Sequence, residues 1–304
     1  MDKKLIIGVV QVLLGAISYG LLATFVRIAY NEGFTTVEVT FAQYFFGFVV
    51  LGTVYLLKSV NRRPSNLEYI QNPGSFWKLI LGGSTLGLTG FFYYLSVLYL
   101  PVSICVVLLM QSIWMGVVLE SIKNRRRLEH QKIISCILVL LGTVLATGAL
   151  ETATSLQPLG LFYGVFAALL LTISLLVFNQ TALELPVPTR SFYIIIGSLS
   201  AITIVAFSSL ITDFNFGIFT SWGIVLGLFG SVLPPVLYSS GMPKTGLGVG
   251  AVLTSAEIPV SVSMAAIVLD ENVDQLQWAG VMLIITAIIL LNLMPRFNFS
   301  AKEK

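Results

Sequence analysis

The chain has 304 residues, of which 56% are hydrophobic and only 10% are charged, and its formal net charge is +3. A soluble globular domain is roughly 45–50% apolar and about 25% charged, so this composition excludes a water-soluble fold. Because lipid offers the backbone no hydrogen-bond partners, each spanning segment must be a helix or part of a closed barrel. The long apolar runs lack the ten-residue alternation of barrel strands and therefore predict helices.

Apolar stretches of about 20 residues follow one another along the whole chain. In chain order they cover residues 5–29, 36–57, 76–98, 101–122, 132–149, 158–178, 190–211, 221–241, 246–269 and 275–294. The first stretch is too long for a signal peptide. Cys105 and Cys136 lie within apolar stretches and are interpreted as packing residues. The sequence thus predicts an all-α integral membrane protein with ten transmembrane helices.

The basic residues are distributed unevenly over the connections between these stretches. If the N-terminus is internal, 16 of the 17 lysines and arginines fall on the internal side, and Arg27 is the exception. The positive-inside rule then places both termini in the cytoplasm. The run Arg125, Arg126 and Arg127 is interpreted as a topology anchor in contact with anionic lipid, and not as a nucleic-acid patch.

The two halves of the chain have similar patterns of apolar blocks. A shift of about 145 positions aligns Gly82 with Gly227, Tyr93 with Tyr238, and Leu108 with Leu253. Five helices per half, an odd number, force the second half to enter the membrane upside down. We therefore expect two inverted-topology repeats, residues 1–150 and 151–304, of the kind found in secondary transporters.

Several stretches resemble the drug/metabolite transporter superfamily, specifically proteins with two EamA domains of five helices each. They are Gly15 with Tyr19-Gly20, residues 82–109 and 227–259, the Leu269-Asp270-Glu271 loop, and residues 277–290. Glu257-Ile258-Pro259-Val260 is similar to the family's proline-bearing stretch. The first half departs from this pattern with Gln111-Ser112-Ile113-Trp114 and with residues 123–127 in place of the loop. The resemblance implies a bundle of ten helices that exports amino acids, metabolites or drugs across a bacterial inner membrane.

Glu257 is the one acidic residue near the middle of a predicted span. A carboxylate at that depth is costly and usually marks a pathway or a proton relay. Gly250, Thr254, Glu257 and Ser261 recur at helical spacing and would share one face. Glu257 is therefore a candidate for proton coupling and for pairing with a substrate amine, and the alternative is a carboxyl that only holds helices together.

Further polar and aromatic residues lie on faces that we expect to look inward. Together with Glu257 they form the candidate substrate site, in which each polar residue alone could instead be a packing contact between helices. The set is Gln11, Ser18, Tyr44, Thr89, Tyr93, Tyr94, Gln111, Trp114, Tyr238 and Thr254. Pro234, Pro235 and Pro259 are candidate hinges, because proline frees a backbone carbonyl within a helix.

The sequence also weighs against other functions. The single histidine, His130, is placed in a cytoplasmic loop, and no metal-binding, cofactor-binding or catalytic motif is present, which argues against an intramembrane enzyme. A channel would need a filter sequence, and none is visible. An exchanger of nucleotide sugars or sugar phosphates would need buried cations, and no lysine or arginine is expected at the midplane. The expected partners are a small-molecule substrate and lipid, without nucleic acid, and the oligomeric state stays open.

Overall fold

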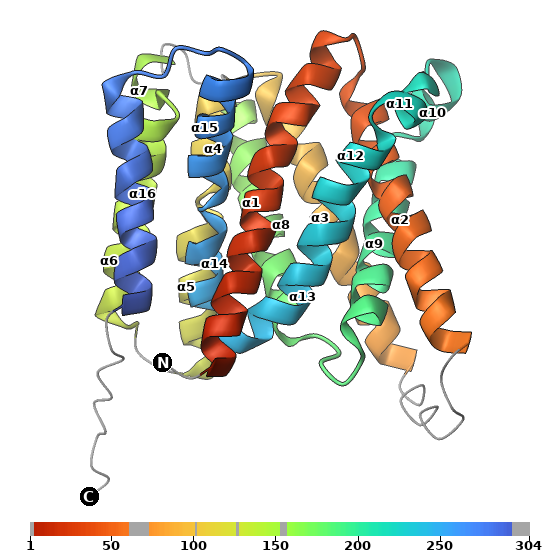
Figure 1. Ribbon diagram of the computed structural model, residues 1–304, viewed down its shortest axis with the longest axis horizontal. Helices are drawn as coiled ribbons and strands as arrows, with labels where there is room; N and C mark the ends of the chain where they lie inside the picture. The colour runs from red at the N-terminus through yellow and green to blue at the C-terminus, as the bar shows by residue number, and fades with distance from the viewer. Residues whose placement is uncertain (1–2, 61–72, 101, 126–127, 153–156, 294–304) are drawn as a thin grey trace, which may run out of the picture.

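The computed structural model describes residues 3–60, 73–100, 102–125, 128–152 and 157–293, and the helices in those ranges stand side by side in one bundle (Figure 1). The first half contains α1 (Lys3–Asn31), α2 (Thr36–Val60), α3 (Pro73–Val97), α4 (Val102–Leu109), α5 (Ser112–Asn124) and α6 (His130–Ala146). The second half contains α7 (Ala149–Thr152), α8 (Pro158–Gln180), α9 (Val187–Val205), α10 (Phe207–Thr212), α11 (Gly217–Ser221), α12 (Gly223–Gly227), the π segment η2 (Leu228–Val232), α13 (Leu233–Thr245), α14 (Leu247–Thr254), α15 (Glu257–Val268) and α16 (Gln275–Leu293).

These elements make ten membrane crossings in the described part of the chain. Eight helical segments are long and apolar enough to span a bilayer, counting α4 with α5, α12 through α13, and α14 with α15 as single crossings. The shorter apolar helices α6 and α16 supply the other two. Large apolar side chains such as Leu14, Phe48 and Ile204 are exposed on the outside of the bundle, where lipid would cover them. The predicted fold of ten transmembrane helices is confirmed.

The packing of the helices follows the expected inverted repeat. In the first half α3 packs on α8 and α9, and in the second half the matching crossing, α12 through α13, packs on α1 and α2. The fifth helix of each half, α6 or α16, packs against the other, and so do α5 and α14. First-half helices thus mostly contact second-half helices, as a pseudo-twofold axis through the bundle requires.

Two predicted spans are broken at equivalent places. The fourth span breaks between Leu109 and Ser112, and the ninth breaks between Thr254 and Glu257, which is the same displacement of about 145 residues that aligns the two halves. In the ninth span Pro259 cannot donate to the Ser255 carbonyl, and Ile258 N–H donates to it instead at 3.0 Å. The continuous helical face predicted from Gly250 to Ser261 is therefore interrupted.

Glycines let the two halves approach closely. A Cβ atom on Gly83 would collide with the backbone of Ile194, and one on Gly197 would collide with the Ile80 carbonyl. On the other side of the axis, a Cβ on Gly47 would collide with Ser231. Small residues serve this purpose in membrane bundles, where packing and not the hydrophobic effect holds helices together.

Arg190 is buried, although it is the first residue of the apolar stretch 190–211 and is counted among the basic residues of the internal side. The helix α9 begins at Val187, so Arg190 lies inside its first turn, against the end of α8. Its guanidinium donates to the carbonyls of Thr181 at 3.0 Å, Ser239 at 2.7 Å and Phe178 at 2.6 Å. The carbonyls of Phe178 and Thr181 lie at the end of α8, where the helix supplies no donor, so Arg190 fastens α8, α9 and α13 together.

Candidate functional site

Glu257 lies at the break in the ninth span, where it is the first residue of α15. Its chain neighbours on both sides are buried, whereas Glu257 itself is partly accessible. None of the ion pairs found among the described residues involves its carboxyl group. A broken membrane helix directs carbonyls from one half and N–H groups from the other toward the same point, as transporter sites do.

Three tyrosines from three other helices lie near Glu257. Tyr19 of α1, Tyr93 of α3 and Tyr238 of α13 are each close enough to Glu257 to interact with it electrostatically. The rings of Tyr19 and Tyr238 lie 5.9 Å apart, and the Tyr238 ring meets Phe178 edge to face at 5.7 Å. We call Glu257, Tyr19, Tyr93 and Tyr238 the central cluster. It combines one acid with aromatic walls from both halves, as small-molecule sites do.

The position of α1 depends on two glycines. A Cβ on Gly15 would lie 2.5 Å from the Tyr238 ring, and one on Gly20 would lie 2.7 Å from the Glu257 carbonyl. Because neither glycine has a side chain, α1 contacts both α13 and α15, which brings Tyr19 beside Tyr238. Both glycines belong to the stretches of the sequence that resemble the drug/metabolite transporter superfamily.

Tyr44 lies near Tyr19 of the central cluster, and Thr89 lies one turn before Tyr93 on α3. Tyr44 is close enough to Tyr19 to interact electrostatically, and its hydroxyl donates to the Leu86 carbonyl at 3.5 Å. The Thr89 hydroxyl donates to the Thr85 carbonyl of its own helix at 2.8 Å. Tyr44 therefore extends the aromatic wall, whereas the Thr89 hydroxyl is engaged in α3. The side chain of Tyr94 lies outside the described part of the chain.

The other predicted site residues have partners of their own. Ser18 donates to the Phe229 carbonyl at 2.8 Å, and Thr254 donates to the Ala251 carbonyl at 2.7 Å. Gln11, two turns nearer the start of α1 than Tyr19, accepts a bond from Lys244 at 2.6 Å. The predicted site residues therefore lie at two different depths in the bundle, and Gln11 is the one nearer the start of α1.

Gln111 and Trp114 form a local pair at the break in the fourth span. Gln111 donates to the Val107 carbonyl at 2.9 Å and accepts the Trp114 indole N–H at 2.9 Å. Trp114 is 41% exposed, so its ring faces outward in part. Through these bonds Gln111 takes up a carbonyl near the end of α4, which supports a break where the span has no proline.

The three candidate hinge prolines all adjoin irregular helix. Pro259 follows the break at Glu257, and Pro234 and Pro235 follow the π segment η2. Of the predicted topology anchors, Arg125 is exposed and ends α5 in a left-handed conformation. Arg126 and Arg127 lie outside the described residues.

The profile of the EamA-like transporter family matches residues 6–148 and again residues 158–293. The chain belongs to this family. The two matches cover nearly all of both halves, which supports the interpretation of the chain as two repeats. The EamA-like family is a family of membrane transporters of the drug/metabolite superfamily, so the central cluster lies inside a transporter.

A solved structure described only as "Crystal structure of protein" has the same fold as this EamA-like transporter. The two superpose with a TM-score of 0.76 at 15% sequence identity, over 93% of this chain and 99% of the other. No curated protein matches the chain. At this identity the likeness concerns the fold alone.

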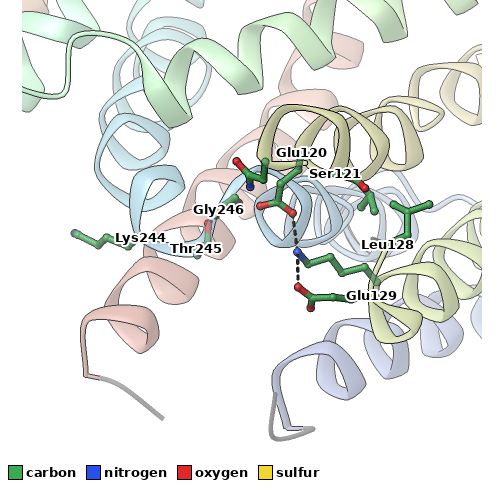
Figure 2. Close-up of a pocket in the computed structure, with 10 residues that line it drawn as sticks. Glu120, Ser121, Leu128, Glu129, Lys244, Thr245 and Gly246 are labelled. Carbon is green, nitrogen blue, oxygen red and sulfur yellow. Dashed lines mark hydrogen bonds and ion pairs between the residues drawn. The ribbon is translucent and has the colours of Figure 1, made fainter. Parts of the chain in front are cut away.

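The EamA-like transporter has a second polar site at the face where α1 begins. There α5, α6 and the turn between α13 and α14 enclose a cavity of about 270 Å³ (Figure 2). Lys132 pairs with Glu120 at 2.6 Å and with Glu129 at 3.4 Å. Gly246, at φ 84°, and Gly248 leave room for the Glu120 carboxylate, since a Cβ on either would lie within 2.7 Å of it. The first-half ion pair thus packs against the second half at this face.

Sequence reasoning missed Tyr19 as a site residue. The predicted site residues Gln11 and Ser18 share a face of α1 with Gly15, and a step of three residues leads from Gly15 to Ser18, whereas a step of four leads to Tyr19. The Tyr19-Gly20 pair indicates this position in the sequence. A glycine allows another helix to pack closely, so the tyrosine next to it has a large ring beside that helix contact. Ser18 faces η2 instead.

Proposed function

We propose that this chain is a secondary active transporter that carries small organic solutes through a site at the central cluster. The observation behind the proposal is the position of Glu257: one carboxyl group, at a helix break, beside tyrosines from both repeats. An acid at such a depth is expensive to keep and is usually functional.

Alternating access is the mechanism that this architecture favours. The two repeats have inverted topology, and the helices of one repeat mostly pack against helices of the other. Rocking one repeat against the other would expose the central cluster first to one side and then to the other. The breaks at the fourth and ninth spans and the prolines Pro234, Pro235 and Pro259 supply places where the helices can bend.

The chemistry of the central cluster bears on the substrate. Its charged group is an acid, and the described basic residues Arg190, Lys132 and Lys244, which are buried or half-buried, are engaged in other bonds toward the face where α1 begins. We therefore propose neutral, zwitterionic or cationic substrates, such as amino acids, amines or cationic drugs. A phosphorylated substrate would lack the cations that it needs.

Proton coupling and export complete the proposal. A carboxyl group in apolar surroundings can carry a proton through one half of the cycle and a substrate amine through the other, which would couple the two flows. With the termini in the cytoplasm of a bacterium, as the distribution of lysine and arginine favours, the protein would sit in the inner membrane and export its substrate. The direction rests on the family resemblance.

Counterflow in proteoliposomes tests whether the chain is a carrier. Vesicles loaded with an unlabelled amino acid or amine are diluted into a trace of the labelled compound, and a carrier accumulates the label transiently. Glu271→Gln, which changes a half-exposed loop carboxylate paired with Arg27 at 2.9 Å, serves as the matched control and should leave counterflow intact. Passive equilibration without transient accumulation would indicate a channel.

A further inference from the structure

The cavity at the face where α1 begins is connected to the central cluster by a single short helix. Its lining comes from both repeats, with α5, α6 and their connection on one side and Lys244, Thr245 and Gly246 on the other. From Gly246 the chain continues into α14, which is buried along its whole length and ends at the break before Glu257. With eight residues, α14 spans about 12 Å between the cavity and the candidate site.

The inner end of the cavity is closed by contact between α5 and α14. Val117 of α5 lines the cavity and is buried. One residue nearer the break in the fourth span, a Cβ on Gly116 would lie 2.9 Å from the Cβ of Ala251, which is completely buried. A solute could therefore pass between the cavity and Glu257 along α14 only after α5 and α14 separate.

The Glu120 carboxylate lies in a notch on the second repeat. Its Oε1 and Oε2 atoms would be 2.7 Å and 2.6 Å from Cβ atoms placed on Gly246 and Gly248, and we call these two residues the glycine notch. Gly246 directly precedes α14, so the carboxylate faces the end of the helix where N–H groups lack intrahelical acceptors. A negative charge at this end stabilises a helix. Glu120 thus attaches α5 to α14 across the two repeats.

Lys132 of α6 holds the Glu120 side chain in this place. Its Nζ atom lies 2.6 Å from Glu120 Oε2 and 3.4 Å from Glu129 Oε1, and in Figure 2 the Glu120 carboxyl group lies between Gly246 and Glu129. The Lys132 and Glu120 side chains are only 14% and 13% exposed. A buried ion pair adds little stability, and its best-attested use is to fix one arrangement of the elements that it joins. Here that arrangement is the contact of α5 with α14.

We propose that this cavity is the closed mouth of the transport pathway and that Glu120, held by Lys132, is the gate that closes it. When the Glu120 carboxylate leaves the glycine notch, α14 can move away from α5, and the cavity deepens toward Glu257. Glu129 shares the same lysine but is 53% exposed, so it is not part of the gate. The gate rests on the proposed function, because it controls access to the central cluster.

The gate is tested by the rate at which a water-soluble maleimide labels Ala251→Cys in the purified full-length protein in lipid nanodiscs. Ala251 is completely buried where α5 meets α14, so its labelling reports separation of these helices. We expect slow labelling of the protein with this change alone, and labelling about five-fold faster or more when Glu120→Gln is added. Glu129→Gln removes an equal charge from the same lysine, so as the matched control it should leave the rate unchanged.

A second variant opens the gate from the other repeat. Gly248→Ala keeps every charge but places a methyl group 2.6 Å from the Glu120 carboxylate, so it should also accelerate labelling. Native Cys105, which is buried in α4, reports unfolding and should stay unlabelled in every variant. Equal rates with and without Glu120→Gln, an equal rise in Glu129→Gln, or a rise that extends to Cys105 would overturn the proposal. Labelling needs no substrate, so its result is independent of counterflow, which tests the proposed function.

Discussion

Ser112 and Glu257 occupy the same position in the two repeats, each as the first residue after the break in its repeat's fourth helix. The Ser112 hydroxyl is buried without a hydrogen-bond partner among the described residues, whereas the residue at the matching position of the second repeat is the acid Glu257, which lies near the tyrosines. The two repeats thus share a backbone plan and differ in chemistry at its centre. An ionisable group is needed only once if one substrate passes at a time.

Adding even one methyl group at the glycine contacts between α3 and α9 should destabilise the protein. In Gly197→Ala the new Cβ would collide with the Ile80 carbonyl, a backbone atom that cannot turn aside. We expect a loss of about 1–3 kcal/mol in the free energy of unfolding, measured by thermal or denaturant unfolding in detergent. Gly223→Ala is the control, because its Cβ would have ordinary contacts, 3.6 Å or more from its neighbours. Equal stability of the two variants would show that the helices are less closely packed.

Arg190 should be essential for folding but not for substrate recognition. In Arg190→Met the carbonyls of Phe178, Thr181 and Ser239 lose their donor within the membrane. We expect the free energy of unfolding to fall by more than about 2 kcal/mol, with little change in substrate affinity in the fraction that folds. Lys123→Met, at an exposed position, is the control. Normal stability together with weakened substrate binding would instead place Arg190 in the transport site.

The Glu120–Lys132 pair should contribute more than the exposed ion pair at the other face. Its side chains are 13% and 14% exposed, against 59% and 39% for Arg27 and Glu271, so water screens it less. A double-mutant cycle with Glu120→Gln and Lys132→Met should give a coupling energy of about 1 kcal/mol or more. The same cycle on Arg27 and Glu271 should give roughly 0–1 kcal/mol. Similar coupling energies for both pairs would contradict this difference.

The orientation in the membrane is tested by cysteine labelling in intact cells. Cys105 and Cys136 are buried, so an impermeant maleimide should not label them in the folded protein. With the termini in the cytoplasm, Asp213→Cys should react with an impermeant maleimide from outside, and Asn124→Cys should react only after the cells are opened. The opposite pattern of labelling would invert the proposed topology and, with it, the direction of transport.

Much of the fold follows from the sequence, because apolar length and charge placement report directly on a membrane environment. The ten spans and the inverted repeat were predictable on this basis. The helix breaks were not predictable, since they depend on which group donates to each backbone carbonyl. Pro259 marks the break in the ninth span. At the break in the fourth span Gln111 makes a side-chain hydrogen bond that ordinary helices also make, so the sequence does not single it out. Arg190 was misplaced because its helix begins three residues earlier than its apolar run.

The candidate site was predictable in part for the same reason. Glu257 stands out by charge alone, and Tyr93 and Tyr238 are linked by the repeat. Tyr19 and the π segment could not be found from periodicity, because both depend on which neighbour a helix face meets. Whether these residues bind substrate stays a prediction.

The most direct test of the central claim compares counterflow by the wild type, Glu257→Gln and Glu257→Asp over a range of pH. Glutamine keeps the size and hydrogen bonds of the side chain but cannot titrate, whereas aspartate keeps the carboxyl group. The account predicts saturable, pH-dependent counterflow for the wild type, loss of that counterflow in Glu257→Gln and pH-dependent residual activity in Glu257→Asp. Counterflow by Glu257→Gln that equals the wild type at every pH would show that Glu257 is structural and that the site lies elsewhere.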